Sequence, residues 1–525
     1  MHNHISWRKR GLTIAAALAT AVALAGCTGG GAGPKPSGGN GEAVQGGELT
    51  IMSAGGVPSW DPLFTFGTLP GVITDRLIAV YGQLLYVDQT GTAIPSMAKS
   101  FTTENGGATW TVAIRDGITF TDGTPYDAAA VKFNWDRAAD PANTASMMAL
   151  AQSFTSEVAD ELTLTLTSPI PNPVLDLQIA EQLQLIASPT ALQAGDYTKP
   201  VGAGPFVLVK EDKQVGEDLA RNADYFEQGK PYLDTLKYRS IGDPSQRVET
   251  IASGGAQLMN GFHSDFRDYE NDDRFAFFEV ENGGFRHFAF NNTRAPFDDA
   301  RARKAISLAV NPEELVQALL ADPTQLGSTT LFNDGSPYYE ASLGLPKQNL
   351  QEAQRLVDEL VADGVDMNIV VVPAAIPELI RAAEYMQLSL QQLKGVTVTI
   401  EQIQIQDWRL RTQSNDDFDI TFYPGIYDVN PAPTTMTNIF QTGGADNFQN
   451  SSSPEMDAAL AELRAATDEA GRTAAVTKVQ KYFVDEVPIS VFGYDNRVFF
   501  HQANVGGFVA IGRGAILPQE LHYTE

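Results

Sequence analysis

The chain has 525 residues, of which 43% are hydrophobic, and a formal net charge of −28. This apolar content is enough for large cores divided over two or three domains. A strongly acidic chain repels nucleic acid and anionic headgroups, so we exclude a nucleic-acid function.

The first 26 residues have the features of an export signal. Arg8, Lys9 and Arg10 precede the apolar run Leu12–Ala25, which is too short for a comfortable membrane span. The run ends at Cys27 and resembles a bacterial lipoprotein signal, which implies lipidation of the Cys27 thiol. The alternatives are a chance cysteine after a signal and an uncleaved anchor. Because Cys27 is the single cysteine, no disulfide framework exists and core burial must stabilise the fold.

Residues 27–46 are rich in glycine and serve as a flexible tether. No later apolar stretch reaches 18 residues, which is the length that indicates a spanning helix. We therefore expect a folded body that is anchored by a lipid on Cys27. It would lie at the outer face of the cytoplasmic membrane or in the periplasm.

The next segments alternate between strand and helix patterns. A strand is predicted over 47–52, before Trp60-Asp61-Pro62. Alternation from Trp110 to Ile114, a turn at Asp116-Gly117 and a return strand at Ile118-Thr119-Phe120 predict a hairpin. A helix is predicted over Asp127–Asp136, and a half-buried strand over Leu162–Leu166.

Later motifs are interpreted as scaffold. Gly202, Gly204 and Pro205 fit a tight turn better than a phosphate loop, because the third glycine of that fingerprint and a following helix are missing. Asn311-Pro312-Glu313-Glu314 predicts a helix N-cap. Two helix faces are predicted to be buried, and they comprise Met456, Leu460, Leu463, Val476, Val479 and Phe483.

Several longer motifs resemble family 5 of the extracellular solute-binding proteins, the oligopeptide, dipeptide and nickel receptors of ABC importers. The resemblance covers 47–525 and rests on motifs in the family's order: Gly106–Pro125, Pro200–Phe206, Arg221–Phe226, Gly229–Asp234, Phe290–Asp299 and Arg301–Ala305.

This resemblance implies an α/β fold of the periplasmic-binding-protein type II kind. Two lobes with an inserted extra domain would close on a ligand in the cleft between them. The implied segments are 47–85, 201–265 and 495–525 for a discontinuous domain I, 86–200 for domain II, and 266–494 for domain III. The partners implied are a solute and the ABC permease subunits, and we expect a monomer with no cofactor.

An enzyme is the rival class. The sequence has no Gly-x-Ser-x-Gly, His-Glu-x-x-His or phosphate-loop motif, so nothing indicates a reaction centre. Its 64 acidic residues leave a chance carboxylate pair open, so an exported hydrolase stays as a remote alternative.

The candidates for metal capture are the four histidines after the signal. His263, His287, His501 and His522 include no pair at metal-ligand spacing, so no metal site is predicted. His263 lies where relatives pass from the first domain to the third, and a nickel chelate would need only one such histidine. A surface or hydrogen-bonded core histidine is the alternative.

A peptide is the expected solute, because the family most often binds peptides. The segment Phe418–Asp428 matches the family's acidic site motif and places Asp428 where a carboxylate pairs with the ligand's ammonium group. Asp428 is alternatively a turn residue ahead of Asn430-Pro431. Two departures weaken the motif: Phe422 replaces an arginine of some peptide receptors, and the turn tryptophan is absent.

A sugar is the other open solute class. It would stack on Trp60, Tyr427 or Trp408. Trp60 is alternatively a core anchor. The substrate-binding candidates are therefore Asp428, Trp60, Tyr427, Asn430, Phe422, Trp408 and His263.

Overall fold

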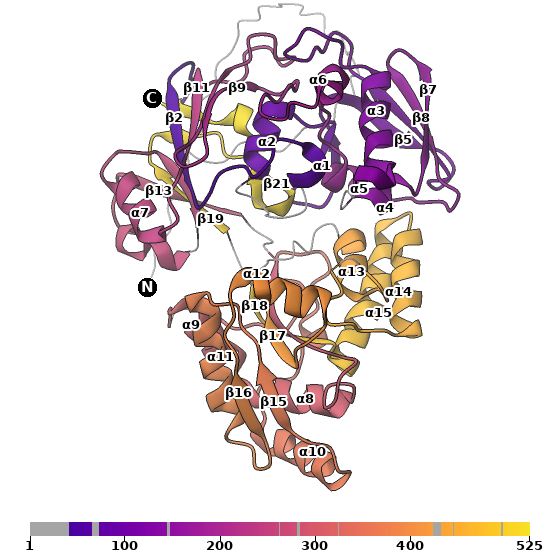
Figure 1. Cartoon of the computed structure of the whole chain (residues 1–525), viewed down its shortest axis with the longest axis vertical. Helices are drawn as coiled ribbons and strands as arrows, with labels where there is room; N and C mark the ends of the chain where they lie inside the picture. The colour runs from indigo at the N-terminus through magenta and orange to yellow at the C-terminus, as the bar shows by residue number, and fades with distance from the viewer. Residues whose placement is uncertain are drawn as a thin grey trace, which may run out of the picture. The chain divides into compact units, whose positions relative to one another are not determined.

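The computed structural model describes residues 41–65, 73–143, 147–261, 263–280, 284–323, 325–423, 432–444, 446–494 and 497–525. Cys27 and the signal lie outside these ranges. Figure 1 shows the chain coloured from its N-terminus to its C-terminus.

The largest sheet has seven strands in the order β13-β19-β12-β2-β11-β10-β9. At its centre, β2 pairs in parallel with β11 on one side and with β12 on the other. The strands are β2 (Glu48–Ser53), β9 (Phe206–Asp212), β10 (Gly216–Arg221), β11 (Thr235–Ser240), β12 (Leu258–Gly261), β13 (Phe275–Val280) and β19 (Arg497–Gln502). The predicted strand over 47–52 is confirmed as β2.

Helices and short strands surround this sheet. The helices are α1 (Pro62–Thr65), α2 (Thr74–Tyr81), α7 (Pro244–Ala252) and the 3-10 helix η2 (His263–Tyr269). A small sheet joins β1 (Ala43–Val44) and β20 (Val505–Gly506) to the C-terminal β23 (His522–Thr524). The first described strand therefore lies beside the end of the chain.

A four-stranded antiparallel sheet in the order β5-β6-β8-β7 follows α2 in the chain. Its strands are β5 (Ala98–Thr103), β6 (Thr109–Ile114), β7 (Thr155–Asp160) and β8 (Thr163–Thr167), and β3 (Leu85–Val87) and β4 (Ala93–Pro95) form a separate pair. Helix α3 (Ala128–Ala139) lies beside this sheet in Figure 1. The other helices are α4 (Met148–Ala151), α5 (Leu175–Gln182) and α6 (Pro189–Ala194).

The predicted helix over 127–136 is confirmed, and Asp127 caps it by accepting from the N–H of Ala130. The predicted strand over 162–166 is confirmed as β8. The predicted hairpin is wrong. Residues Ile118–Phe120 form no strand; β6 pairs with β5 and β8, since those strands offer full-length partners.

The third large sheet has five strands in the order β16-β15-β17-β14-β18. They are β14 (Phe285–Phe290), β15 (Asn368–Val371), β16 (Thr397–Ile400), β17 (Ile420–Phe422) and β18 (Ile489–Tyr494). Its helices are α8 (Ala300–Ala309), α9 (Pro312–Leu320), α10 (Leu350–Ala362), α11 (Pro377–Leu390), α12 (Ile405–Arg409), α13 (Ala432–Phe440), α14 (Pro454–Ala465) and α15 (Glu469–Glu486).

Helix α9 begins at the predicted cap, where Asn311 accepts from the N–H groups of Glu313 and Glu314. The predicted apolar faces of α14 and α15 are buried, which confirms both. Gly202 and Gly204 permit close packing on α2: a Cβ on Gly202 would lie 2.2 Å from the carbonyl oxygen of Val80, as expected for a scaffold turn.

The chain passes between the two largest sheets at two places. It leaves the seven-stranded sheet after Val280 and enters the five-stranded sheet at Phe285, and it returns between Tyr494 and Arg497. The strands that flank the two passages pair with each other. In the seven-stranded sheet β13 pairs with β19, and in the five-stranded sheet β14 pairs with β18.

The hydrophobic clusters follow this division. One cluster combines buried residues of the seven-stranded and four-stranded sheets. Another consists of buried hydrophobic residues that lie between Phe285 and Phe492 in the chain. The expected domain boundaries stay a prediction. One strand inside the expected domain III, β13, hydrogen-bonds into the seven-stranded sheet.

Candidate functional site

The carboxyl ends of three adjacent parallel strands, β12, β2 and β11, lie at one edge of the seven-stranded sheet. Open α/β sheets bind ligands outside this kind of edge. The loop of residues 54–58 follows β2 there, and His263 lies two residues beyond β12, where η2 begins. The fold thus brings the start of the Trp60 segment and the backbone of His263 to one edge. The side chain of His263 lies outside the described part of the structure.

The five-stranded sheet repeats this relationship. β15 pairs in parallel with β16 and with β17, so these three strands also end at a common edge. β17 ends at Phe422, and the segment 424–431 follows after Tyr423. Tyr427, Asp428 and Asn430 belong to that segment and lie outside the described residues.

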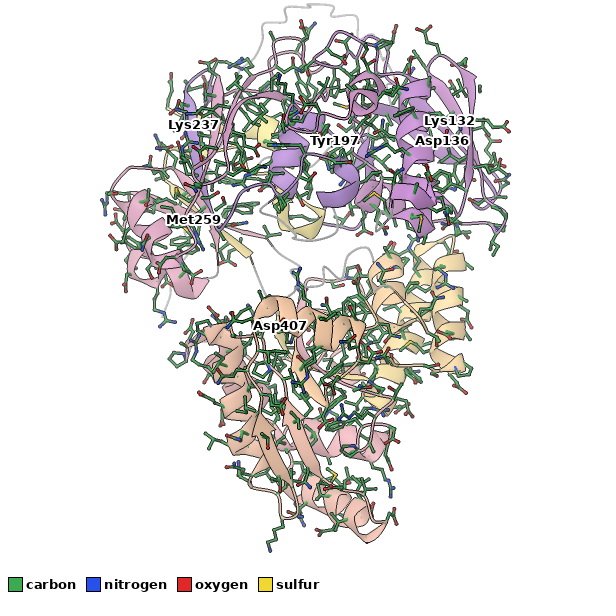
Figure 2. All side chains as sticks on the ribbon, in the orientation of Figure 1. Lys132, Asp136, Tyr197, Lys237, Met259 and Asp407 are labelled. Carbon is green, nitrogen blue, oxygen red and sulfur yellow. The ribbon has the colours of Figure 1, made fainter. Side chains whose placement is uncertain are left out.

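Trp60 is enclosed by the protein and is 1% exposed. Its indole Nε1 donates to Glu211 Oε1 at 3.1 Å, and its carbonyl oxygen accepts from the hydroxyl of Tyr81. The next residue, Asp61, accepts from Arg137 Nη1 at 2.8 Å, and Arg137 Nη2 also donates to Tyr197, which is labelled in Figure 2. The hydrogen bonds to Asp61 raise the pKa of Arg137. These contacts fit the core alternative for Trp60.

Trp408 and Phe422 are each 1% exposed and belong to the core of the five-stranded sheet. Trp408 Nε1 donates to Thr421 Oγ1 at 2.8 Å, which joins α12 to β17. Phe422 packs edge-on against Phe288 and Phe492. In this structure both rings are used for core packing, and neither offers a face for stacking a sugar.

Tyr423, the last described residue before the Asp428 segment, is held by three rings. It stacks on His287 and on Phe448, with centroids 5.6 and 5.5 Å away, and meets Trp408 edge-on. Burial lowers the pKa of His287 to about 3, so this imidazole is neutral at physiological pH. Tyr423 thus belongs to an aromatic cluster that ends just before the segment 424–431 in the chain. The sequence did not reveal this cluster, because its members lie far apart in the chain.

Within the described ranges, no three His, Cys, Asp or Glu side chains converge as a metal site would require. Among the described helices, none is long and apolar enough to cross a membrane.

Residues 92–447 match the family described as bacterial extracellular solute-binding proteins, family 5 (middle). The chain belongs to this family. It is a family of transport binding proteins, and the sequence resemblance is confirmed.

Several proteins that are similar to this family 5 chain carry names or bound ligands that identify their own solutes. The glutathione-binding protein GsiB of Escherichia coli O1:K1 is 29% identical over 281 residues, which are 52% of this chain and 54% of the relative. The chain thus matches about half the length of that relative.

Solved structures confirm the type II binding-protein fold over nearly the full length. DppA of Helicobacter pylori, in complex with the peptide STSA, has a TM-score of 0.79 at 19% identity and covers 92% of this chain and 99% of its own. NikZ of Campylobacter jejuni, in complex with Ni(L-His), has a TM-score of 0.76 at 17% identity and covers 90% and 99%.

Proposed function

We propose that this family 5 protein is a lipid-anchored, extracytoplasmic receptor that captures an oligopeptide by lobe closure and delivers it to an ABC import permease. It works as a binding protein without a catalytic step. Membership of the family supports solute capture, and the peptide-bound DppA supports the solute class.

The proposal rests on two segments that occupy corresponding positions in their respective sheets. The loop after β2 and the segment with Asp428 each follow the carboxyl end of a parallel strand, in separate sheets. A solute held by both segments would bridge two lobes, one built on the seven-stranded sheet and the other on the five-stranded sheet. The chain joins these lobes at its two passages. In this proposal Asp428 binds the ammonium group of the peptide, with Tyr427 and Asn430 beside it.

The loop after β2 would meet the peptide through its backbone. Ala54 and Gly55 are exposed, and the N–H groups of Ala54, Gly55 and Gly56 donate to no other described group. A Cβ on Gly55 would have no atom within 4 Å, and Gly55 lies outside the positive-φ region. The protein's own packing therefore does not require a glycine there, whereas close approach of a solute backbone would use one.

Native mass spectrometry of protein purified without denaturation, followed by calorimetric titration, tests the solute class. The probes are glutathione, the dipeptide Met-Leu, the tetrapeptide Ser-Thr-Ser-Ala, a nickel–histidine complex and glucose. We expect a retained peptide and binding of at least one peptide probe. Binding of only the nickel complex or only the sugar would overturn the peptide assignment.

A further inference from the structure

A buried ion pair lies behind the loop that follows β2. Arg76 of α2 and Glu217 of β10 are 0% and 2% exposed, and Arg76 Nε lies 3.2 Å from Glu217 Oε2. The Arg76 guanidinium also lies over the ring of Tyr238, 4.7 Å from its centroid. Solvent does not reach either charge.

Both partners of this pair also hold the loop. Arg76 Nη1 donates to the carbonyl oxygen of Gly55 at 2.7 Å, and Nη2 donates to Ser53 Oγ. Glu217 Oε1 accepts from the N–H of Val57 at 3.1 Å. The chain is therefore bound at Ser53, Gly55 and Val57, while the residues Ala54 and Gly55 are exposed to solvent.

Stability alone does not explain this arrangement. Removing two charges from water is costly, and a buried ion pair is often no more stabilising than two apolar side chains of similar size. Burial lowers the pKa of Arg76, while the charge of Glu217 opposes that shift. What an apolar pair lacks is the set of directed hydrogen bonds to Ser53, Gly55 and Val57.

We infer that Arg76 and Glu217 are positioning residues that hold the backbone of Ser53–Val57 in its solute-binding shape. This inference rests on the proposed function. A loop that is already ordered loses little conformational entropy when a solute binds, so the pair strengthens binding although neither side chain touches the solute.

The double variant Arg76→Met/Glu217→Leu tests the inference, because it removes both charges and leaves no unpaired one in the core. Hydrogen exchange read by mass spectrometry follows the peptide that contains residues 53–61. We expect faster exchange there and unchanged exchange in β11 and β12. Titration with the tightest-binding of glutathione, Met-Leu and Ser-Thr-Ser-Ala should show a loss of affinity of about tenfold or more.

Arg303→Met is the matched control. Arg303 of α8 is also buried, and it holds the carbonyl oxygens of Phe297, Glu486 and Val487, remote in sequence from the loop. This variant should lose stability, yet leave both the loop exchange and the probe affinity as in the parent protein.

A second variant, Gly55→Val, separates the inference from the proposed function. It leaves the ion pair intact and should weaken probe binding with little change in thermal stability. If Gly55→Val weakens binding while the double variant binds as the parent does, the pair is only structural and the inference fails. If neither variant changes the affinity, the loop does not meet the solute. The inference and the proposed contact of the loop with the peptide then both fail, while the peptide assignment stands.

The exchange measurement needs no ligand. Unchanged exchange over residues 53–61 in the double variant overturns the inference directly. If the parent binds none of the three peptides, the peptide assignment fails on that result, while the exchange measurement still decides whether the pair holds the loop.

Discussion

Trp60 Nε1 donates to Glu211 Oε1 at 3.1 Å, and this bond joins the segment after β2 to the edge strand β9. The same carboxylate oxygen also accepts from Lys213, whose Nζ lies 2.6 Å away and also donates to the carbonyl oxygen of Val57. Trp60 is thus held in a network that stiffens the path from β2 to α1.

Trp60→Phe is expected to destabilise the protein by about 1–3 kcal/mol, because it removes a buried donor and leaves space in a packed core. Solute affinity should change less than twofold, since the ring is enclosed. Chemical denaturation and titration on the same sample provide both values. A large loss of affinity at unchanged stability would instead show that the ring meets the solute.

The neutral, buried His287 should make stability depend on pH. Its folded pKa is about 3 against an ordinary value of 6.5, so below pH 6.5 the unfolded chain takes up a proton that the folded chain does not. This group's contribution is therefore complete above pH 6.5 and falls as the pH decreases towards 3. Relative to neutral pH, the loss at pH 5 is about 2 kcal/mol.

His287→Phe keeps a ring beside Tyr423 and removes the titration. Denaturant unfolding at pH 7 and pH 5 should show a smaller fall in the free energy of unfolding for the variant than for the parent. An equal fall in both proteins would contradict a buried, neutral His287.

Asp428 is predicted to hold the ammonium group of the solute. Asp428→Asn should weaken peptide binding by about 2–4 kcal/mol, because the ligand's charge loses its partner in a desolvated site. The melting temperature of the ligand-free protein should barely change, whereas a turn-forming aspartate would lower it. Capping the amine is the control: N-acetylated peptide should bind the parent as weakly as free peptide binds the variant.

Solute should shift the protein towards a closed form. We expect a smaller radius of gyration in X-ray scattering at saturating solute, together with a higher melting temperature, because a ligand that binds only the folded closed state stabilises it. Scattering curves that superimpose with and without solute would indicate a rigid receptor.

Cys27 is predicted to carry the lipid anchor. Cys27→Ser should give a precursor that incorporates no labelled fatty acid, because the thiol is the acceptor atom. Fractionation of cells that express parent and variant measures this. Membrane association and lipid incorporation by the variant at parental levels would exclude the anchor.

Local chemistry determined the elements that the sequence predicted correctly. Asp127 and Asn311 cap helices through atoms two or three residues away, and the apolar spacing of α14 and α15 marks their buried faces. The motifs from Gly106 onward also identified the family. The hairpin predicted at Ile118–Phe120 is wrong, because strand pairing depends on partners that are distant in the chain. Strand β6 pairs instead with β5 and β8, which are longer.

The sequence by itself determined the family of the protein, since the motifs and their order both lie along the chain. Only the tertiary structure showed how Trp60, Trp408 and Phe422 are enclosed, and that Arg76 and Glu217 meet behind one loop. Burial and ion pairing arise from residues on separate elements. The spacing of residues along the chain does not encode these contacts. The contact of Arg76 with Glu217, for example, forms only when α2 and β10 have packed together.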